Sequence, residues 1–203
     1  MHVFCIRHGE SQGNAGEYHS GWSAVRLTEN GRAQAAAAGE MVRPIRFDRI
    51  FVSDLLRTQE TAMLALPDRV NDFELTSDIR EYHSGFVVGQ KFSEMDEQLG
   101  EPYRHARATF DYTFAEGESP AEFFARISRF MRRLEQLEGC ENVAVFCHAG
   151  VLRTIARYAL SLPPDGPAFP SHNCSVSILD WDGTKWRIAV WNHTPDLSRY
   201  FPK

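Results

Sequence analysis

The chain has 203 residues, of which 43% are hydrophobic and 24% are charged, and its formal net charge at pH 7 is −5. This size and composition are typical of one compact domain with a substantial core. A net negative charge gives no general attraction to nucleic acids or acidic membranes, so we expect neither as a partner, and an anionic ligand would need a local cluster of basic side chains.

Predicted strands and helices alternate from the start of the chain. Apolar runs at residues 3–6 and 47–53 predict two strands. Between them, the spacing of apolar side chains over residues 28–42 predicts a helix that stops before Pro44. This order is typical of α/β proteins, in which parallel strands are connected through helices.

A second helix is predicted over residues 54–66, directly after a strand. Asp54 can cap its free backbone amides, and Pro67 ends it. Arg57 lies in the first turn of this helix. We therefore expect the Arg57 side chain near the end of the preceding strand, where α/β proteins bind their ligands.

The second half of the chain resumes the alternation after a less regular segment, residues 72–116, which mixes aromatic and charged side chains. Ser119 and Glu122 form a predicted capping box at the start of a helix that continues to about residue 137. The elements predicted after it are a strand at 142–147, a helix at 151–162, and a hairpin of strands 174–181 and 185–191 that closes one edge of the sheet.

Two of the predicted strands deliver histidines at their C-terminal ends. The first is followed by Arg7-His8-Gly9-Glu10, and the strand at 142–147 is followed by His148. The ends of parallel strands share one edge of a sheet, so the two histidines can meet over one site. An imidazole can attack a phosphorus atom, a guanidinium can bind phosphate oxygens as a fork, and a glycine permits close approach.

Further motifs accompany these two, in the order Arg7-His8-Gly9-Glu10-Ser11 with Asn14, Gly21-Trp22, segments 27–35 and 53–62, Glu81 with Gly85 and Gly89, Gly117-Glu118-Ser119, and His148-Ala149-Gly150. In order and spacing they resemble the histidine phosphatase superfamily, in its phosphoglycerate mutase-like branch, over nearly the whole chain. The resemblance implies a three-layer α/β/α sandwich with a mostly parallel central sheet. It also implies a single domain over residues 1–203, with an insertion at about 72–116 that covers the substrate.

The resemblance assigns roles to seven residues. It makes His8 the nucleophile that is transiently phosphorylated and Glu81 the general acid, and it places Arg7, Arg57, His148, Asn14 and Gly21 in phosphate and substrate binding. Within the insertion, it makes Arg104, His105 and Arg107 candidate specificity residues. The implied activity is that of a phosphomonoesterase acting on a small phosphorylated metabolite, without metal or cofactor.

Elementary chemistry supports these roles. Uncatalysed phosphate-monoester hydrolysis is among the slowest reactions that enzymes accelerate, so positioning and charge must supply most of the barrier reduction. Adjacent cations such as Arg7 and Arg57 favour the neutral form of His8, which is the nucleophilic form. A bound phosphate dianion would raise the pKa of Glu81 and help it to retain its proton until the leaving group departs.

Three alternatives stay open. A phosphoglycerate mutase would use the same residues, although 203 residues is short for such enzymes in this family. A phosphate-binding protein without catalysis is the second. The third is a cysteine-dependent phosphatase, because Cys147, Gly150, Arg153 and Thr154 satisfy its Cys-x2-Gly-x2-Arg-Thr pattern. That hypothesis would leave the motifs around His8, Arg57 and Glu81 without a function.

The cysteines and the remaining histidines give no sign of a metal site. Cys5, Cys140, Cys147 and Cys174 lack the spacing of paired metal ligands, and the other histidines are scattered along the chain. Cys5 and Cys147 lie in apolar runs, where a reduced thiol packs as a small hydrophobic group. Since we also find no secretory signal and no run of the ~18 apolar residues that span a bilayer, we expect a cytoplasmic protein.

Overall fold

The computed structural model describes residues 1–194, which form a six-stranded sheet in the order β3-β2-β4-β1-β5-β6. Strands β1 (His2–Arg7), β2 (Arg49–Ser53), β3 (Phe73–Thr76) and β4 (Asn142–Cys147) are parallel. Strands β5 (Val176–Trp181) and β6 (Trp186–His193) form an antiparallel hairpin, with β5 against β1. The sheet is therefore mostly parallel, and the hairpin lies at one edge as predicted.

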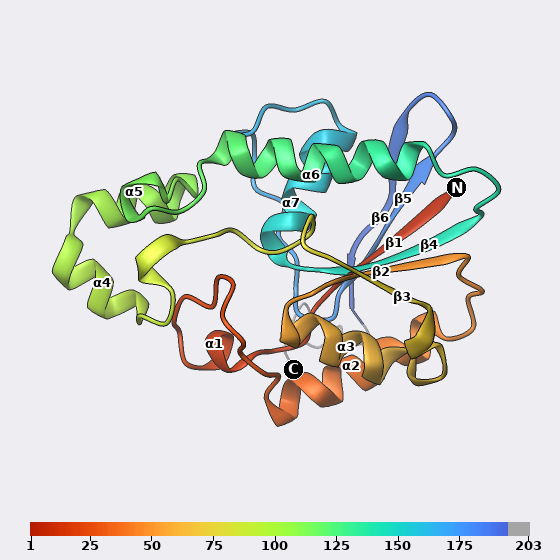
Figure 1. Ribbon diagram of the computed structural model, residues 1–203, viewed down its shortest axis with the longest axis horizontal. Helices are drawn as coiled ribbons and strands as arrows, with labels where there is room; N and C mark the ends of the chain where they lie inside the picture. Colours follow the sequence, from red (N-terminus) through yellow and green to blue (C-terminus); the bar gives the residue numbers. More distant parts are fainter. Residues whose placement is uncertain (195–203) are drawn as a thin grey trace, which may run out of the picture.

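Helices cover both faces of this sheet (Figure 1). Helices α6 (Pro120–Glu135) and α7 (Ala149–Ala159) lie on one face, and α2 (Glu29–Val42) and α3 (Leu56–Ala65) lie on the other. The predicted three-layer α/β/α sandwich is confirmed. No helix within residues 1–194 is both long enough and apolar enough to cross a membrane.

The alternation of side chains along the strands divides the interior into two cores. In β4, Val143 and Val145 pack with the core under α6 and α7, whereas Ala144 and Phe146 pack with the core that contains side chains of α2 and α3. Successive side chains of a strand point to opposite faces, so a strand that is buried on both faces is apolar throughout. This explains why residues 142–147 were recognisable from their sequence.

The segment after β3 extends beyond the end of the sheet. It contains η2 (Gly85–Val87), α4 (Phe92–Leu99), α5 (Glu101–Thr109) and η3 (Thr113–Ala115). The segment buries a small core of its own, formed by Val87, Met95, Tyr103, Ala106, Tyr112 and Ala115. Its start differs from the expected boundary at about residue 72, because Phe73–Thr76 pairs with β2 and belongs to the sheet. The remaining short helices are α1 (Gln12–Ala15) and η1 (Pro67–Asp72).

Helix boundaries follow the capping residues with one correction. The capping box of Ser119 and Glu122 opens α6 as predicted. Asp54 does not cap α3, because the N-cap position is occupied by Leu55, which makes no side-chain cap hydrogen bond. The Asp54 carboxylate instead accepts two hydrogen bonds from the Arg80 guanidinium, at 2.6 and 2.5 Å. A bidentate ion pair with a distant residue has replaced the local cap.

Candidate active site

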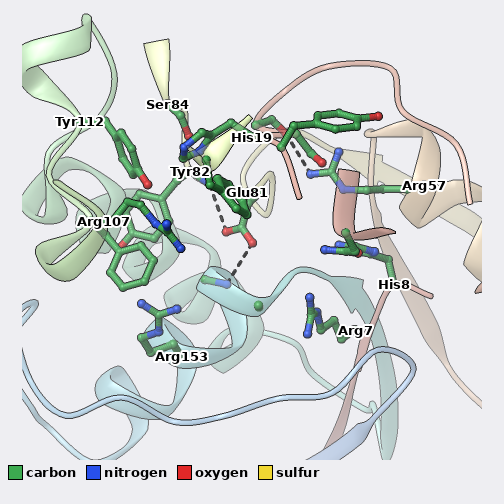
Figure 2. A pocket seen from close by; sticks show the side chains of 18 residues that line it. Arg7, His8, His19, Arg57, Glu81, Tyr82, Ser84, Arg107, Tyr112 and Arg153 are labelled. Atoms are coloured by element: carbon green, nitrogen blue, oxygen red, sulfur yellow. Dashed lines mark hydrogen bonds between the residues drawn. The ribbon is translucent and has the colours of Figure 1, made fainter. Parts of the chain in front are cut away.

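A cavity of about 280 Å³ lies at the C-terminal ends of the parallel strands (Figure 2). Its lining residues come from the end of β1, the loop between β1 and α2, α3, the chain after β3 from Glu81 onward, the segment with α4 and α5, and the start of α7. Of the seven residues with predicted roles, six line this cavity: Arg7, His8, Asn14, Gly21, Arg57 and Glu81. His148 is not among the lining residues, but its ring centroid lies 5.1 Å from that of His8.

The hydrogen bonding of His8 determines which ring nitrogen carries a proton. Its Nδ1 lies 2.7 Å from the carbonyl oxygen of Gly9, which can only accept, so Nδ1 is the donor. Burial lowers the pKa of His8 well below 6.5, and the charges of Arg57 and Arg7 lower it further. The imidazole is therefore neutral at pH 7, with a lone pair on Nε2.

Two guanidinium groups lie beside this imidazole, that of the buried Arg57 and that of the partly buried Arg7. Arg57 is 1% exposed and donates through Nη2 to the Gly21 carbonyl oxygen at 2.9 Å. Arg7 donates through Nη1 to the Ser171 carbonyl oxygen at 2.6 Å. The Nε atoms of both arginines are buried without a hydrogen-bond partner among the described residues. Burial lowers the pKa of Arg57 to about 10, which leaves it charged at neutral pH.

Buried N–H donors without partners are costly, because they have lost water and gained no acceptor. An anion that enters the cavity would supply the missing acceptor and offset the buried positive charge. Arginine is suited to this task, since its planar fork matches the oxygens of phosphate and carboxylate groups. The surroundings of His8 therefore have the properties of an anion site.

His148 is held by two hydroxyl groups. Its Nε2 lies 2.9 Å from Ser53 Oγ and 3.2 Å from Thr58 Oγ1, and its Nδ1 is buried without a partner among residues 1–194. Burial lowers the pKa of His148 well below 6.5, and Arg57 lowers it further. The residue follows β4 and precedes α7, which explains its position beside His8 at the neighbouring strand end.

The carboxylate of Glu81 is oriented by backbone amides. It accepts hydrogen bonds from the amide of Tyr82 and from the amide of Gly150, both at 3.1 Å (Figure 2). A Cβ atom at residue 150 would overlap Glu81 Oε1 and lie 2.8 Å from the Tyr82 ring, so any larger residue there would displace this carboxylate. The start of α7 thus positions a carboxylate that comes from the opposite side of the cavity.

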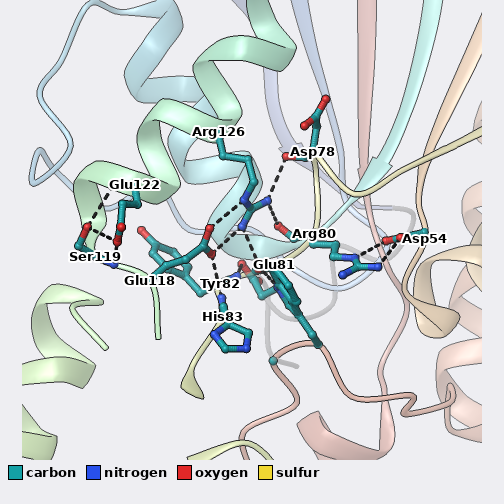
Figure 3. A network of polar contacts seen from close by, with 12 residues as sticks. Asp54, Asp78, Arg80, Glu81, Tyr82, His83, Glu118, Ser119, Glu122 and Arg126 are labelled. Atoms are coloured by element: carbon teal, nitrogen blue, oxygen red, sulfur yellow. Dashed lines mark hydrogen bonds and ion pairs between the residues drawn. The ribbon is translucent and has the colours of Figure 1, made fainter. Parts of the chain in front are cut away.

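The backbone that carries Glu81 is held by a second network (Figure 3). The Arg126 guanidinium on α6 donates to the carbonyl oxygens of Asp78, Arg80 and Glu81 at distances of 2.9 to 3.2 Å. It also forms two hydrogen bonds, at 2.9 and 2.7 Å, with the Glu118 carboxylate. The sequence motif Gly117-Glu118-Ser119 contained this glutamate, but nothing in the sequence linked it to residue 126.

Asn14 and Gly21 both lie at the cavity, and each makes a hydrogen bond there that the sequence motifs did not predict. The Asn14 side-chain oxygen accepts from the backbone amide of Ser11 at 3.1 Å, which directs the side chain toward the cavity. Gly21 has a φ of +41°, in the left-handed region, and its carbonyl oxygen orients Arg57. Both residues therefore contribute to the arrangement around the anion site.

The structure separates the three candidate specificity residues. Arg107 lines the cavity, whereas Arg104 forms ion pairs with Asp96 at 3.3 Å and Glu101 at 3.2 Å outside it, and His105 is exposed. Arg153 also lines the cavity, although its sequence had suggested a role only in the cysteine hypothesis. Further lining residues that sequence reasoning missed are His19, Tyr82, Phe92, Phe110 and Tyr112.

Cys147 lies in an environment that disfavours a thiolate. Its side chain is fully buried, and burial raises its pKa well above 9. Reactive cysteines have lowered pKa values and partial exposure. Within residues 1–194, no group of three or more His, Cys, Asp or Glu side chains is placed to hold a metal ion.

The chain is similar to known proteins in both sequence and structure. Residues 3–194 match the histidine phosphatase superfamily (branch 1). The chain is 30% identical over 166 residues to the adenosylcobalamin/alpha-ribazole phosphatase of Salmonella typhimurium, covering 80% of this chain and 81% of that one. It is 28% identical to phosphoglycerate mutase-like protein 4 of Arabidopsis thaliana, covering 97% of this chain and 86% of that one.

Solved structures show the same fold. The alpha-ribazole phosphatase from Shigella flexneri superposes with a TM-score of 0.87 at 26% identity, over 95% of this chain and 96% of that one. A mycobacterial glucosyl-3-phosphoglycerate phosphatase, solved as a complex with VO3, superposes with a TM-score of 0.83 at 29% identity, over 95% of this chain and 99% of that one. On this evidence, the chain belongs to the histidine phosphatase superfamily, branch 1.

Proposed function

We propose that the protein is a phosphomonoesterase that hydrolyses a small phosphorylated metabolite through a phosphohistidine on His8. The observation that carries this proposal is a neutral imidazole whose Nδ1 proton is bonded to a carbonyl oxygen, next to two arginines whose Nε atoms are buried without partners among the described residues. The names of the relatives support it, since they include phosphatases of alpha-ribazole and glucosyl-3-phosphoglycerate esters.

In the first step, the lone pair of His8 Nε2 attacks phosphorus and forms the N–P bond. The ester P–O bond breaks, and its electron pair stays on the departing oxygen, which takes a proton from the Glu81 carboxyl group. Arg7 and Arg57 neutralise the charge that spreads over the phosphoryl oxygens, and His148 contributes a hydrogen bond.

In the second step, water attacks the phosphorus of phosphohistidine. The Glu81 carboxylate accepts a proton from this water, and the N–P bond breaks with return of its electron pair to Nε2. Inorganic phosphate leaves, and both His8 and Glu81 regain their starting protonation states.

We also propose that this single domain needs no metal ion and that the segment with α4 and α5 covers the substrate. Two guanidinium groups supply the positive charge that a metal would otherwise provide. Aromatic side chains from the segment with α4 and α5, such as Phe92 and Phe110, line the cavity above the strand ends. The described cysteines are free thiols, which supports a reducing, cytoplasmic location.

A panel of phosphomonoesters tests the proposal. We expect the wild-type protein to release inorganic phosphate in the presence of EDTA, and the His8→Ala variant to be inactive. Radiolabelled substrate, quenched in alkaline denaturant because phosphohistidine is labile in acid, should leave label on the wild-type chain only. Activity that survives His8→Ala would contradict the proposal. Isomerisation of 3-phosphoglycerate without phosphate release would instead identify a mutase.

A further inference from the structure

Two cavity arginines, Arg107 on α5 and Arg153 on α7, have no part in the proposed phosphoryl transfer. Figure 2 shows them on one side of Glu81, with Arg7, His8 and Arg57 on the other side. They therefore face a part of the cavity that lies away from the nucleophile. A substrate whose phosphoryl group binds at His8 would extend its remaining atoms toward them.

The Arg153 guanidinium has a free edge. Its central carbon lies 3.7 Å from the centroid of the Phe110 ring, so one face of the planar group is covered by the ring. The N–H bonds of a guanidinium point outward in its plane, and a stacked ring does not satisfy them. Accordingly, the Nη1 atom is buried without a hydrogen-bond partner among the described residues.

The Arg107 guanidinium also lies over aromatic rings, although residue 107 is more exposed than residue 153, and its central carbon is 6.0 Å from the centroid of the Tyr103 ring. Its guanidinium carbon lies 4.6 Å from the centroid of the Phe92 ring. Neither Arg107 nor Arg153 forms an ion pair with another residue of the described part of the chain. Arg104, three positions earlier on α5, shows the ordinary behaviour of a surface arginine, since it pairs with both Asp96 and Glu101.

The charge of the cavity exceeds what one phosphate can neutralise. Its lining holds four arginines, Arg7, Arg57, Arg107 and Arg153, and a single acidic side chain, Glu81. His19 adds no charge, because burial and Arg107 lower its pKa to about 4. A phosphate monoester carries about two negative charges at neutral pH. At least one positive charge would thus remain without a counter-charge in the complex.

We propose that Arg107 and Arg153 bind a second anionic group, a carboxylate or another phosphate, on the phosphomonoester that this enzyme hydrolyses. The inference rests on the proposed function and narrows its substrate class. An uncharged aromatic substituent fits less well, because the rings of Phe92 and Phe110 are already occupied by the two guanidinium groups. Two arginine forks instead offer in-plane donors to the oxygens of an anion.

A pair of nearly isosteric substrates tests the proposal. Glycerol 3-phosphate and 3-phosphoglycerate differ in one position, which is a hydroxymethyl group in the first and a carboxylate in the second. We expect kcat/KM of the wild-type enzyme to be about 10- to 100-fold higher for 3-phosphoglycerate than for glycerol 3-phosphate. This is the size of effect that hydrogen bonds to a charged group typically give. Glycerol 1,3-bisphosphate tests a second phosphate, and benzyl phosphate compared with propyl phosphate tests an aromatic substituent.

Variants assign the preference to the two arginines. Arg153→Met and Arg107→Met should each remove most of the preference by raising KM for 3-phosphoglycerate, while kcat/KM for glycerol 3-phosphate changes little. Arg153→Lys should retain part of the preference, because it keeps the charge and loses the fork. Arg104→Met is the matched control on α5 and should retain the full preference, since Arg104 lies outside the cavity.

The outcomes separate this inference from the proposed function. Equal kcat/KM for the two glycerol esters, an unchanged preference in both Met variants, or a preference for benzyl phosphate would overturn the inference while phosphatase activity stands. Loss of phosphate release in every assay would count against the proposed function. In that case, calorimetric Kd values for the two glycerol esters on His8→Ala still test the second anion site, because binding needs no nucleophile.

Discussion

The protonation state of His8 follows from two local contacts. A carbonyl oxygen binds the Nδ1 proton, and the burial of the ring, reinforced by the charges of Arg57 and Arg7, lowers the His8 pKa and disfavours a second proton. Arg57 is itself held by the Gly21 carbonyl oxygen, so its charge is fixed in position rather than free to follow the substrate. Preorganised charge of this kind avoids reorganisation during the reaction, which is the main source of electrostatic catalysis.

Glu81→Gln tests the acid at the level of one residue. An amide cannot donate the proton that an alkoxide leaving group requires, so we expect kcat for alkyl phosphates to fall about 100-fold or more. Hydrolysis of p-nitrophenyl phosphate should fall much less, because its leaving group is stable without protonation. Steady-state kinetics on both esters give the measurement, and equal losses on both would remove Glu81 from the role of acid.

Cys147→Ser distinguishes the two candidate nucleophiles. The thiol is fully buried and protonated, so its replacement should leave phosphate release largely intact. A buried hydroxyl without a partner should reduce stability by about 1–3 kcal/mol, which urea denaturation would measure. An inactive but folded Cys147→Ser, together with an active His8→Ala, would reverse the assignment in favour of the cysteine.

Among the elements, α6 holds the backbone of Glu81, the proposed acid, although it lies outside the cavity lining. Arg126 binds three carbonyl oxygens of the chain that leads to Glu81, and Glu118 holds the Arg126 guanidinium in place. Trp22 also donates from its indole to the Glu81 carbonyl oxygen, at 2.7 Å. The backbone of Glu81 is therefore supported from two sides, while its carboxylate is held by α7.

Arg126→Lys should reduce activity through Glu81. A lysine cannot bind three carbonyl oxygens and a carboxylate at once, so we expect the acid to be misplaced and kcat for alkyl phosphates to fall about 10- to 100-fold. The loss for p-nitrophenyl phosphate should be small. In the Glu81→Gln background, the same substitution should have little further effect on alkyl phosphates, since the proton is already missing.

Arg133→Gln is the control for this prediction. Arg133 lies on the same helix and pairs with Glu74 at 3.1 Å, but no hydrogen bond joins it to the described backbone around Glu81. Its substitution should leave the ratio of alkyl to aryl activity unchanged. A change of that ratio by Arg133→Gln, or independent losses from Arg126→Lys and Glu81→Gln, would disprove the positioning role.

For the whole molecule, three buried histidines make the stability of the folded state depend on pH. His8 and His148 are buried with pKa values well below 6.5, and the pKa of His19 is lowered to about 4. In the unfolded chain these histidines titrate near the reference value of about 6.5. Below that pH the unfolded state binds more protons than the folded state, so acid favours unfolding.

We therefore expect full stability above pH 6.5 and a decline as the pH falls from 6.5 toward the lowered pKa values. Each such histidine contributes a slope of up to about 1.4 kcal/mol per pH unit. Urea denaturation at pH 7.5, 6.0 and 5.0 measures the decline, and His19→Gln should make it shallower. A stability that does not change across this range, or a slope that His19→Gln leaves intact, would contradict the lowered pKa values.

Features that depend on neighbouring residues in the chain could be predicted from the sequence, whereas features that depend on distant partners could not. Strand β4 and the capping box of α6 were predicted because apolar runs and caps involve near neighbours. Strand β3 was missed, since it is a short, half-exposed edge strand with a weak apolar pattern. The local sequence predicts Asp54 as a helix cap, whereas its actual partner, Arg80, lies 26 residues away along the chain.

The sequence by itself determined the α/β fold and the family resemblance. It also predicted that Arg7, His8, Arg57 and Glu81 lie in one cavity, because strand ends and the spacing of motifs can be recognised from the order of residues. Only the tertiary structure decided which ring nitrogen of His8 carries its proton, which residue holds the backbone of Glu81, and that Arg153 joins Arg107 in the cavity. Those properties arise from contacts between residues far apart in the chain, and hydrophobic periodicity carries no information about them.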